Sequence, residues 1–214
     1  MNDVSVSVQH LCRQYGDERV LHDITIDFEA GRIHGIVGNN GSGKTVLFKC
    51  ICGFVLPTSG RVLVDYEEVG KDVDFPDSLG FIIETPGFLP HLTGRANLEL
   101  LAAMRGRIGK SEVRDALAQV GLDADLRKRV GAYSLGMRQR LGIAQAIMER
   151  PSLLVLDEPF NGLDRQGVRH IRTLLAQMNT EGTTILLTSH NAADIEELCD
   201  TVCEMDAGVL RVLR

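Results

Sequence analysis

Gly38-Asn39-Asn40-Gly41-Ser42-Gly43-Lys44-Thr45 is the segment around which the chain is organised. An apolar run at residues 33–37 precedes it and residues 46–51 follow, which predicts a buried strand before the segment and a helix after it. Small residues let backbone N–H groups approach phosphate oxygens, and the start of a helix adds partial positive charge. We therefore predict a phosphate-binding loop, with Lys44 placing its charge on the outer phosphates and the Thr45 hydroxyl on Mg²⁺. The alternative, a glycine-rich turn closed by a surface lysine, is disfavoured by the flanking strand and helix.

The composition is that of an ordinary globular protein. A length of 214 residues suits one large domain or two subdomains that share a core. The net charge of −6 argues against a protein that mainly grips a nucleic-acid backbone. We find no long uncharged apolar span and no basic segment followed by an apolar one at residues 1–5, so neither a transmembrane helix nor a secretory signal is expected. Five cysteines, an odd number, favour a reducing compartment and buried apolar side chains over disulfides or a zinc site.

Hydrophobic periodicity divides the chain into three parts. The first 37 residues alternate with period two and predict strands that are partly antiparallel. Further strands are expected at residues 61–65, 79–83, 153–156, 184–188, 201–205 and 209–212, and residues 66–78 read as a loop. Helices are expected from Thr93, a plausible N-cap, and at residues 111–120, 136–148, 168–178 and 192–199. Because strands alternate with helices outside the middle third, the sequence predicts a parallel sheet interrupted by a helical insert.

Four chemically distinctive spots lie where predicted strands end: the phosphate loop, Glu84, Asp157-Glu158 and His190. The carboxyl ends of parallel strands share one edge, so these spots predict one active site. Asp157 suits Mg²⁺, and Glu158, which points away from it, is free to orient or deprotonate an attacking water. The alternative for Asp157-Glu158 alone is a solvated turn. His190 either contacts a terminal phosphate or caps the helix that follows it.

Taken together, these residues resemble the nucleotide-binding subunit of the ATP-binding cassette (ABC) transporter family. Besides the phosphate loop, four further motifs occur in the family's order along nearly the whole chain. They are the signature Tyr133-Ser134-Leu135-Gly136-Met137, the strand ending in Asp157-Glu158-Pro159, the aspartate loop Asn161-Gly162-Leu163-Asp164, and Ser189-His190 with the switch histidine. Five motifs in order are far more specific than any one alone.

The resemblance implies a fold and a set of roles. The fold is α/β, a P-loop NTPase core with a mostly parallel sheet and flanking helices, an N-terminal antiparallel β subdomain and an inserted helical subdomain. Residues 1–214 then form a single ABC ATPase domain, with residues 1–84 and 151–214 as the nucleotide-binding core and residues 85–150 as the helical subdomain. Tyr15 is expected to stack on adenine. The alternative is a half-exposed aromatic side chain in a turn, without a binding role. Glu158 becomes the general base, His190 the sensor of the γ-phosphate, and Ser134 and Gly136 the contacts to a nucleotide held by a second subunit.

Two departures from the usual family pattern stand out. Leu135 and Met137 replace a glycine and a glutamine of the signature, whereas the phosphate-contacting Ser134 and Gly136 are present. Glu84 stands where most of the family has glutamine, a position that reaches Mg²⁺ and the lytic water, so it is a third candidate metal residue beside Thr45 and Asp157. This glutamate variant resembles exporters of the bacitracin-resistance and lantibiotic-immunity type. A carboxylate there adds negative charge near Mg²⁺. We therefore expect Glu84 to change how the site is coupled to the metal, and not to abolish the site.

The resulting hypothesis is an ATP-hydrolysing motor subunit that binds ATP and Mg²⁺, dimerises as a homodimer or heterodimer, and drives separate transmembrane permease subunits. It implies a cytoplasmic protein held on the inner face of the membrane through the permease. No nucleic-acid partner is expected, and the exported substrate is expected to be a peptide or an antimicrobial compound. The alternative is a soluble ABC-type ATPase that acts on the ribosome or DNA. A P-loop kinase or GTPase would not explain the signature, the aspartate loop or His190.

Overall fold

The computed structural model describes residues 3–84 and 86–214, and its centre is a six-stranded sheet. The strand order is β10-β9-β3-β8-β7-β6, and every pairing is parallel except that of the edge strand β10 with β9. The strands are β3 (Ile33–Val37), β6 (Leu79–Ile82), β7 (Leu153–Leu156), β8 (Thr184–Thr188), β9 (Thr201–Asp206) and β10 (Val209–Val212). The mostly parallel sheet expected from the apolar runs is confirmed, and β7 and β8 are buried along their whole length.

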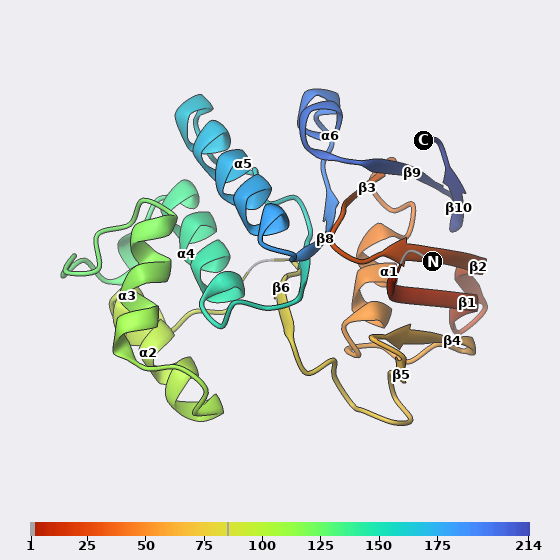
Figure 1. Ribbon diagram of the computed structural model, residues 1–214, viewed down its shortest axis with the longest axis horizontal. Coiled ribbons are helices and arrows are strands. Elements are labelled where there is room, and N and C mark those ends of the chain that lie inside the picture. Colours follow the sequence, from red (N-terminus) through yellow and green to blue (C-terminus); the bar gives the residue numbers. More distant parts are fainter. Residues whose placement is uncertain (1–2, 85) are drawn as a thin grey trace.

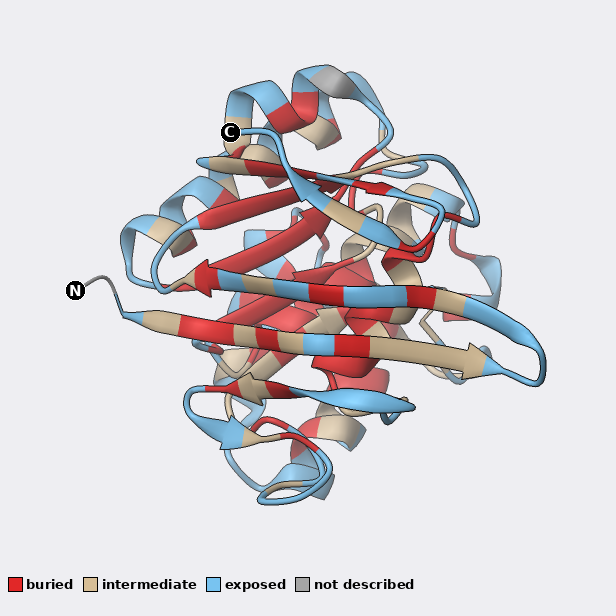
Figure 2. Cartoon of the chain, turned by 90° about the vertical axis from the view of Figure 1, so that its right-hand side faces the viewer, coloured by how far each residue is buried: buried red, intermediate tan, exposed pale blue. Residues whose placement is uncertain are grey.

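A second, antiparallel sheet is built from the N-terminal part of the chain. Its order is β2-β1-β4-β5, and the strands are β1 (Val4–Tyr15), β2 (Glu18–Glu29), β4 (Ser59–Val64) and β5 (Glu67–Glu68). Figure 2 shows the long strands β1 and β2 side by side, with buried and exposed residues along both. The alternation of small apolar and polar residues that predicted these strands thus places one set of side chains against the core.

The expectation of a loop throughout residues 66–78 is wrong at β5, which pairs with Leu63 and Val64. The connecting residues Asp65 and Tyr66 both have left-handed backbones, with φ of 48° and 71°. Two positive φ angles are typical of the tight hairpin turn that favours Asn-Gly or Asp-Gly. Since Tyr66 is neither glycine nor asparagine, the turn carries no readable signal in the sequence.

The helices lie on both sides of the six-stranded sheet, and α2 to α4 form a separate group at the left of Figure 1. They are α1 (Lys44–Ile51), α2 (Gly94–Arg105), α3 (Lys110–Gln119), the short 3₁₀ helix η1 (Val130–Ala132), α4 (Leu135–Ile147), α5 (Arg165–Thr180) and α6 (Ala192–Leu198). Thr93 caps α2 as predicted, its hydroxyl accepting from the Ala96 N–H at 3.2 Å. Helix α5 starts earlier than expected because Asp164 caps it by accepting from Gly167 N–H at 2.7 Å.

The side chains of β7 alternate between two cores, which explains why this strand is apolar throughout. Leu154 and Leu156 pack with the residues of α2 to α5, whereas Leu153 and Val155 pack with α1 and the antiparallel sheet. Burying both faces removes more apolar surface from water than an amphipathic strand would, at about 25 cal/mol per Å². The rigid strand then fixes the positions of the polar residues that follow it.

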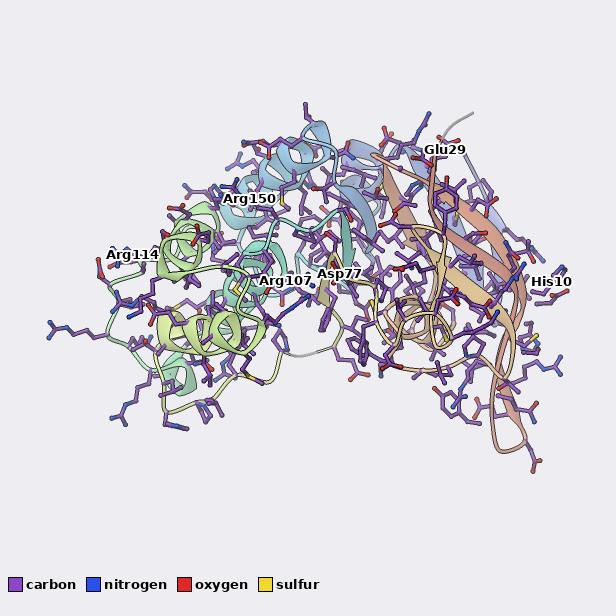
Figure 3. All side chains as sticks on the ribbon, turned by 60° about the horizontal axis from the view of Figure 1, so that its bottom comes forward. His10, Glu29, Asp77, Arg107, Arg114 and Arg150 are labelled. Carbon is purple, nitrogen blue, oxygen red and sulfur yellow. The ribbon has the colours of Figure 1, made fainter. Side chains whose placement is uncertain are left out.

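Polar contacts tie the helical group back to the sheet. Arg107, just after α2, donates from Nη1 to the Asp77 carbonyl at 2.8 Å and pairs with the Asp77 carboxylate, and the two side chains lie together in Figure 3. This guanidinium lowers the pKa of Asp77. The division of the chain at residues 84/85 and 150/151 stays a prediction, and Thr85, the first residue of the expected insert, lies outside the described residues. Among the residues that the structure describes, no helix has the length and hydropathy needed to cross a membrane.

Candidate active site

The phosphate loop connects β3 to α1, and its glycines take conformations that other residues would strain. Gly38, Gly41 and Gly43 have φ of 147°, 78° and 110°. A Cβ on Gly38 would lie 2.1 Å from the Met205 carbonyl oxygen, so only glycine lets the loop pass β9 at this distance. The loop is thus held in one shape by the strands beneath it.

The inside of this loop offers donors for an anion. Helix α1 begins at Lys44 without a side-chain cap, which leaves the N–H groups of its first turn available. Lys44 is buried and its ammonium donates to the carbonyls of Gly38 and Asn39 at 2.7 and 2.9 Å. The Ser42 hydroxyl is buried and has no hydrogen-bond partner among the described residues. A buried hydroxyl without a partner is costly, and a phosphate oxygen would satisfy it.

Asp157 lies directly after β7 and receives two hydroxyl hydrogen bonds. Thr45 Oγ1 donates to its Oδ2 at 2.6 Å, and Thr188 Oγ1 donates to its Oδ1 at 2.7 Å. The structure therefore brings together Thr45 and Asp157, two predicted metal residues separated by 112 positions. Carboxylate and hydroxyl oxygens are the hard donors that Mg²⁺ prefers, so the donor set fits this ion. Thr188 was not singled out from the sequence, where it appeared only as the end of a strand.

Glu158 and His190 also meet, although they come from the ends of different strands. Glu158 Oε2 lies 2.8 Å from His190 Nδ1 and accepts from the His190 backbone N–H at 3.3 Å. The Glu158 backbone is left-handed, with φ of 51°, and its N–H donates to Thr188 Oγ1 at 2.8 Å. The alternative role of His190 as a helix cap is wrong, because Asn191 caps α6 by accepting from Ala193 N–H at 3.1 Å.

Glu84 shares a cavity with Asp157 and Glu158 but is held by another partner. The cavity has a volume of about 550 Å³, and Leu135 and Gln139 of α4 line it as well. Lys49 of α1 donates to Glu84 Oε1 at 2.6 Å. The extra negative charge expected at Glu84 is thus paired with a lysine that the sequence pattern does not single out. Across the described part of the chain, His, Cys, Asp and Glu side chains form no group of three or more suited to a metal.

The signature segment opens α4. Ser134 caps this helix, its hydroxyl accepting from Met137 N–H at 3.2 Å, which leaves the hydroxyl hydrogen available to an acceptor. A Cβ on Gly136 would lie 2.7 Å from the Gly162 carbonyl oxygen, so the signature and the aspartate loop pack closely. Leu135 is 65% exposed, which places an apolar side chain beside the candidate phosphate contacts.

Tyr15 lies at the end of β1 and is 44% exposed. The Arg13 guanidinium lies 4.3 Å from the centre of its ring and is anchored by a hydrogen bond from Nη1 to the Leu56 carbonyl at 2.9 Å. Arginine over an aromatic face is a favourable cation–π arrangement. Arg13 therefore covers one face of the Tyr15 ring, while the residue as a whole stays exposed.

Four of the five cysteines are small buried side chains, as expected, whereas Cys12 is only half-buried. Burial raises the pKa of Cys50 and of Cys199 to about 12 and that of Cys203 to about 11, and it raises the pKa of Cys52 as well. All five cysteines, Cys12 included, are free thiols. Thiols with raised pKa values are poor nucleophiles and metal ligands, so these four take no part in the chemistry of the site.

Comparison with known proteins gives a consistent picture. Residues 21–161 match the family described as ABC transporter. The chain is 40% identical over 205 residues to an uncharacterized ABC transporter ATP-binding protein, YybJ, of Bacillus subtilis (strain 168), covering 96% of this chain and 94% of the relative. It is 43% identical over 207 residues to the bacitracin transport ATP-binding protein BcrA of Enterococcus faecalis, covering 96% and 67%. The lantibiotic transport ATP-binding protein SrtF of Streptococcus pyogenes is 33% identical over 198 residues, covering 92% and 85%.

Solved structures agree on the architecture. An ATP-binding subunit of an ABC transporter superposes with a TM-score of 0.86 at 28% identity, covering 97% of this chain and 90% of that one. The dimeric ATP-binding cassette MJ0796, in a post-hydrolysis state bound to ADP and Pi, gives a TM-score of 0.86 at 22% identity, covering 98% and 99%. The α/β fold with an antiparallel N-terminal sheet is the fold of these cassettes.

Proposed function

The chain belongs to the ABC transporter family, and from this premise we propose that it is the ATP-hydrolysing motor subunit of an exporter. The observation that carries the proposal is the common edge of the sheet. There the phosphate loop follows β3, Asp157-Glu158 follows β7, and Ser189-His190 follows β8, and hydrogen bonds connect the three strand ends. Phosphoryl transfer to water depends on positioning and charge neutralisation, which rigid strand ends supply.

In this proposal the phosphate loop holds the nucleotide. Backbone N–H groups of the loop and of the first turn of α1 surround the phosphates, and the orphaned Ser42 hydroxyl gains an acceptor. Lys44 exchanges its two carbonyl acceptors for phosphate oxygens. The ring of Tyr15 stacks on adenine. These roles rest on the donors that the loop exposes and on the family to which the chain belongs.

Thr45 and Asp157 are the residues proposed to hold Mg²⁺. When bound, Mg²⁺ neutralises phosphate charge and orders the phosphate oxygens. Supporting this role, the Thr45 hydroxyl and the Asp157 carboxylate already point at each other, at 2.6 Å. Glu84, whose Oε1 is held by Lys49, is proposed as a third oxygen ligand or as a ligand through water.

Glu158 is proposed as the base that orients the attacking water and accepts its proton. Its carboxylate lines the cavity beyond β7, and its contact with His190 Nδ1 leaves the other carboxylate oxygen, Oε1, for a water. His190 is 70% exposed, which suits a residue that contacts a γ-phosphate as well as Glu158. The two side chains thus link the water to the phosphate that it attacks.

The rest of the assembly follows from the same premise. Ser134 and Gly136 are proposed to complete the site of a second nucleotide-binding subunit, identical or related, so that ATP joins the two face to face. The start of α4 presents a hydroxyl and N–H groups for that purpose. Separate transmembrane permease subunits are proposed to dock on the helical subdomain and the Glu84 segment. The chain would then work in the cytoplasm, on the inner face of the membrane.

The export substrate is proposed to be a peptide or another antimicrobial compound, because BcrA and SrtF, two relatives, are bacitracin and lantibiotic transport proteins. The alternative of a soluble ATPase on the ribosome or DNA gains no support from these relatives. The net charge of −6 also disfavours a nucleic-acid partner.

A variant of the phosphate-loop lysine tests the proposal at two levels. Cells that express the chain together with its candidate permease should tolerate more bacitracin or lantibiotic than cells that lack the chain. Lys44→Ala should abolish this protection, and the purified variant should lose ATP hydrolysis, because it lacks the ammonium that balances the phosphate charge. Lys71→Ala, a change of an exposed lysine far from the loop, is the matched control. Hydrolysis by Lys44→Ala at the wild-type rate would refute the phosphate-loop assignment. If the wild-type chain hydrolyses ATP but gives the cells no protection, only the proposed class of export substrate is refuted.

A further inference from the structure

Thr188, the last residue of β8, has a hydroxyl that connects the two acidic residues at the end of β7. It is fully buried, at 0% exposure. Its Oγ1 accepts from the Glu158 backbone N–H at 2.8 Å and donates to Asp157 Oδ1 at 2.7 Å. Strands β7 and β8 are neighbours in the sheet, so the contact is made between two fixed strand ends.

We propose that Thr188 is a positioning residue for ATP hydrolysis, which orients the Asp157 carboxylate toward Mg²⁺ and holds the backbone of Glu158. The inference rests on the proposed function, since it concerns the same site. Thr188 itself touches neither nucleotide nor metal in this proposal, and it acts through the two residues that do.

The direction of the two hydrogen bonds is set by chemistry. A backbone N–H can only donate, so Thr188 Oγ1 is the acceptor toward Glu158. A hydroxyl has one hydrogen, which therefore goes to Asp157 Oδ1. Thr45 occupies the other oxygen, Oδ2, at 2.6 Å. The carboxylate is thus fixed at both oxygens, with Oδ1 turned to the sheet and Oδ2 turned to the residue proposed to share Mg²⁺. Donors behind a ligating carboxylate orient it in the same way in other metal sites.

The contact with Glu158 addresses a second need of the site. Glu158 has a left-handed backbone, which a residue with a side chain adopts only when its surroundings hold it. Thr188 holds the N–H before the bend, and Gln139 of α4 donates to the Pro159 carbonyl after it at 2.9 Å. With both sides of the bend fixed, the Glu158 side chain is aimed at His190.

Packing alone would not require a hydroxyl at this position. The three residues before Thr188 in β8 are Ile185, Leu186 and Leu187, all fully buried and apolar. Valine has nearly the shape of threonine and would continue this run. The same strand also provides a matched control, because Thr184 at its other end is 2% exposed and accepts from Gly31 N–H at 2.9 Å, remote from the acidic pair.

The experiment compares Thr188→Val, Thr188→Ser and Thr184→Val with the wild type. Binding of a non-hydrolysable ATP analogue is measured by calorimetry over a range of Mg²⁺ concentrations and again in EDTA, together with kcat and KM for ATP. Thr188→Val should raise the Mg²⁺ concentration for half-maximal binding by about 10–100-fold and lower kcat, as losses of outer-shell partners do. Binding of the analogue in EDTA should not change. Thr188→Ser, which keeps the hydroxyl, should restore both values, and Thr184→Val should leave the Mg²⁺ dependence at the wild-type value.

Several outcomes would overturn the inference. A wild-type Mg²⁺ dependence and kcat in Thr188→Val would show that the hydroxyl positions nothing. If Thr184→Val shifts the Mg²⁺ dependence equally, or if Thr188→Ser does not restore the wild-type Mg²⁺ dependence and kcat, the effect belongs to the strand as a whole. If Thr188→Val does not fold, Thr188→Cys replaces it, because a thiol is a weak donor and should also raise the Mg²⁺ requirement. Failure of the proposed function is distinguishable, since the wild type itself would then bind no nucleotide.

Discussion

Glu84 and Glu158 occupy matching positions on two neighbouring strands. Strands β6 and β7 pair in parallel with Ile82 opposite Leu156, and each glutamate lies two residues beyond its strand's paired end. Both have left-handed backbones, with φ of 59° and 51°. Such angles are uncommon outside glycine, so the sheet builds the same unusual bend twice and places the same side chain on it each time.

What separates the two bends is their partners. Glu158 is 23% exposed and contacts His190, and its N–H is held by Thr188. Glu84 is 64% exposed and pairs with the side-chain nitrogen of Lys49. An exposed ion pair forms and breaks at little cost, whereas a backbone N–H held by the buried hydroxyl of Thr188 stays in place. The comparison teaches that one backbone geometry supports either a fixed carboxylate or a releasable one, depending on what the neighbouring elements contribute.

The largest effect is expected when the fixed carboxylate is neutralised. Glu158→Gln should still bind ATP and should form a more stable dimer, but hydrolyse ATP roughly 10²–10⁴-fold more slowly, because an amide cannot accept the proton of the water. Steady-state hydrolysis and size-exclusion chromatography with ATP measure the two effects. If the variant hydrolyses ATP at the wild-type rate in the steady state, Glu158 is not the base. The Glu158 bend would then differ from the Glu84 bend in its contacts but not in a catalytic role.

The same change at the other bend, Glu84→Gln, is the matched variant and should act on a different property. ATP binding should be kept, because the amide retains an oxygen at this position, while transport per ATP in the complex with the permease should change. Reconstituted vesicles with the permease give this ratio, and calorimetry gives the affinity. A complete loss of nucleotide affinity would make Glu84 a structural residue and would remove the proposed difference.

The sequence predicted the parts of this picture that depend on local pattern. Apolar runs ending in a polar residue predicted β6, β7 and β8, and parallel strands predicted that their carboxyl ends would meet. The contacts of Thr45 with Asp157 and of Glu158 with His190 agree with that prediction. Period-two alternation predicted the antiparallel sheet, although not the hairpin at Asp65 and Tyr66, whose turn residues carry no typical signal.

The partners that distinguish the two bends could not be predicted in this way. Lys49 is separated from Glu84 by 35 residues, and Thr188 from Asp157 by 31. Their contacts depend on the register of β8 and on how α1 packs against the sheet, which no local periodicity encodes. Arg13 was missed for a different reason. It lies two residues before Tyr15 on the same strand, where alternation places both side chains on one face, and this spacing was the available signal.

The smallest effect is expected for the ion pair itself. Lys49→Met keeps an unbranched side chain one atom shorter and removes its charge, and Glu84→Gln removes the opposite charge. A double-mutant cycle on urea unfolding should give a coupling free energy of about 0.2–1 kcal/mol, the range of partly exposed pairs. The coupling should decrease in 1 M salt, where the screening length falls to about 3 Å. A coupling above about 3 kcal/mol, insensitive to salt, is the range of buried pairs and would make the Glu84 bend as fixed as that of Glu158. The measurement therefore decides whether the β6 end is held loosely enough for its carboxylate to move toward Mg²⁺ while the β7 end stays in place.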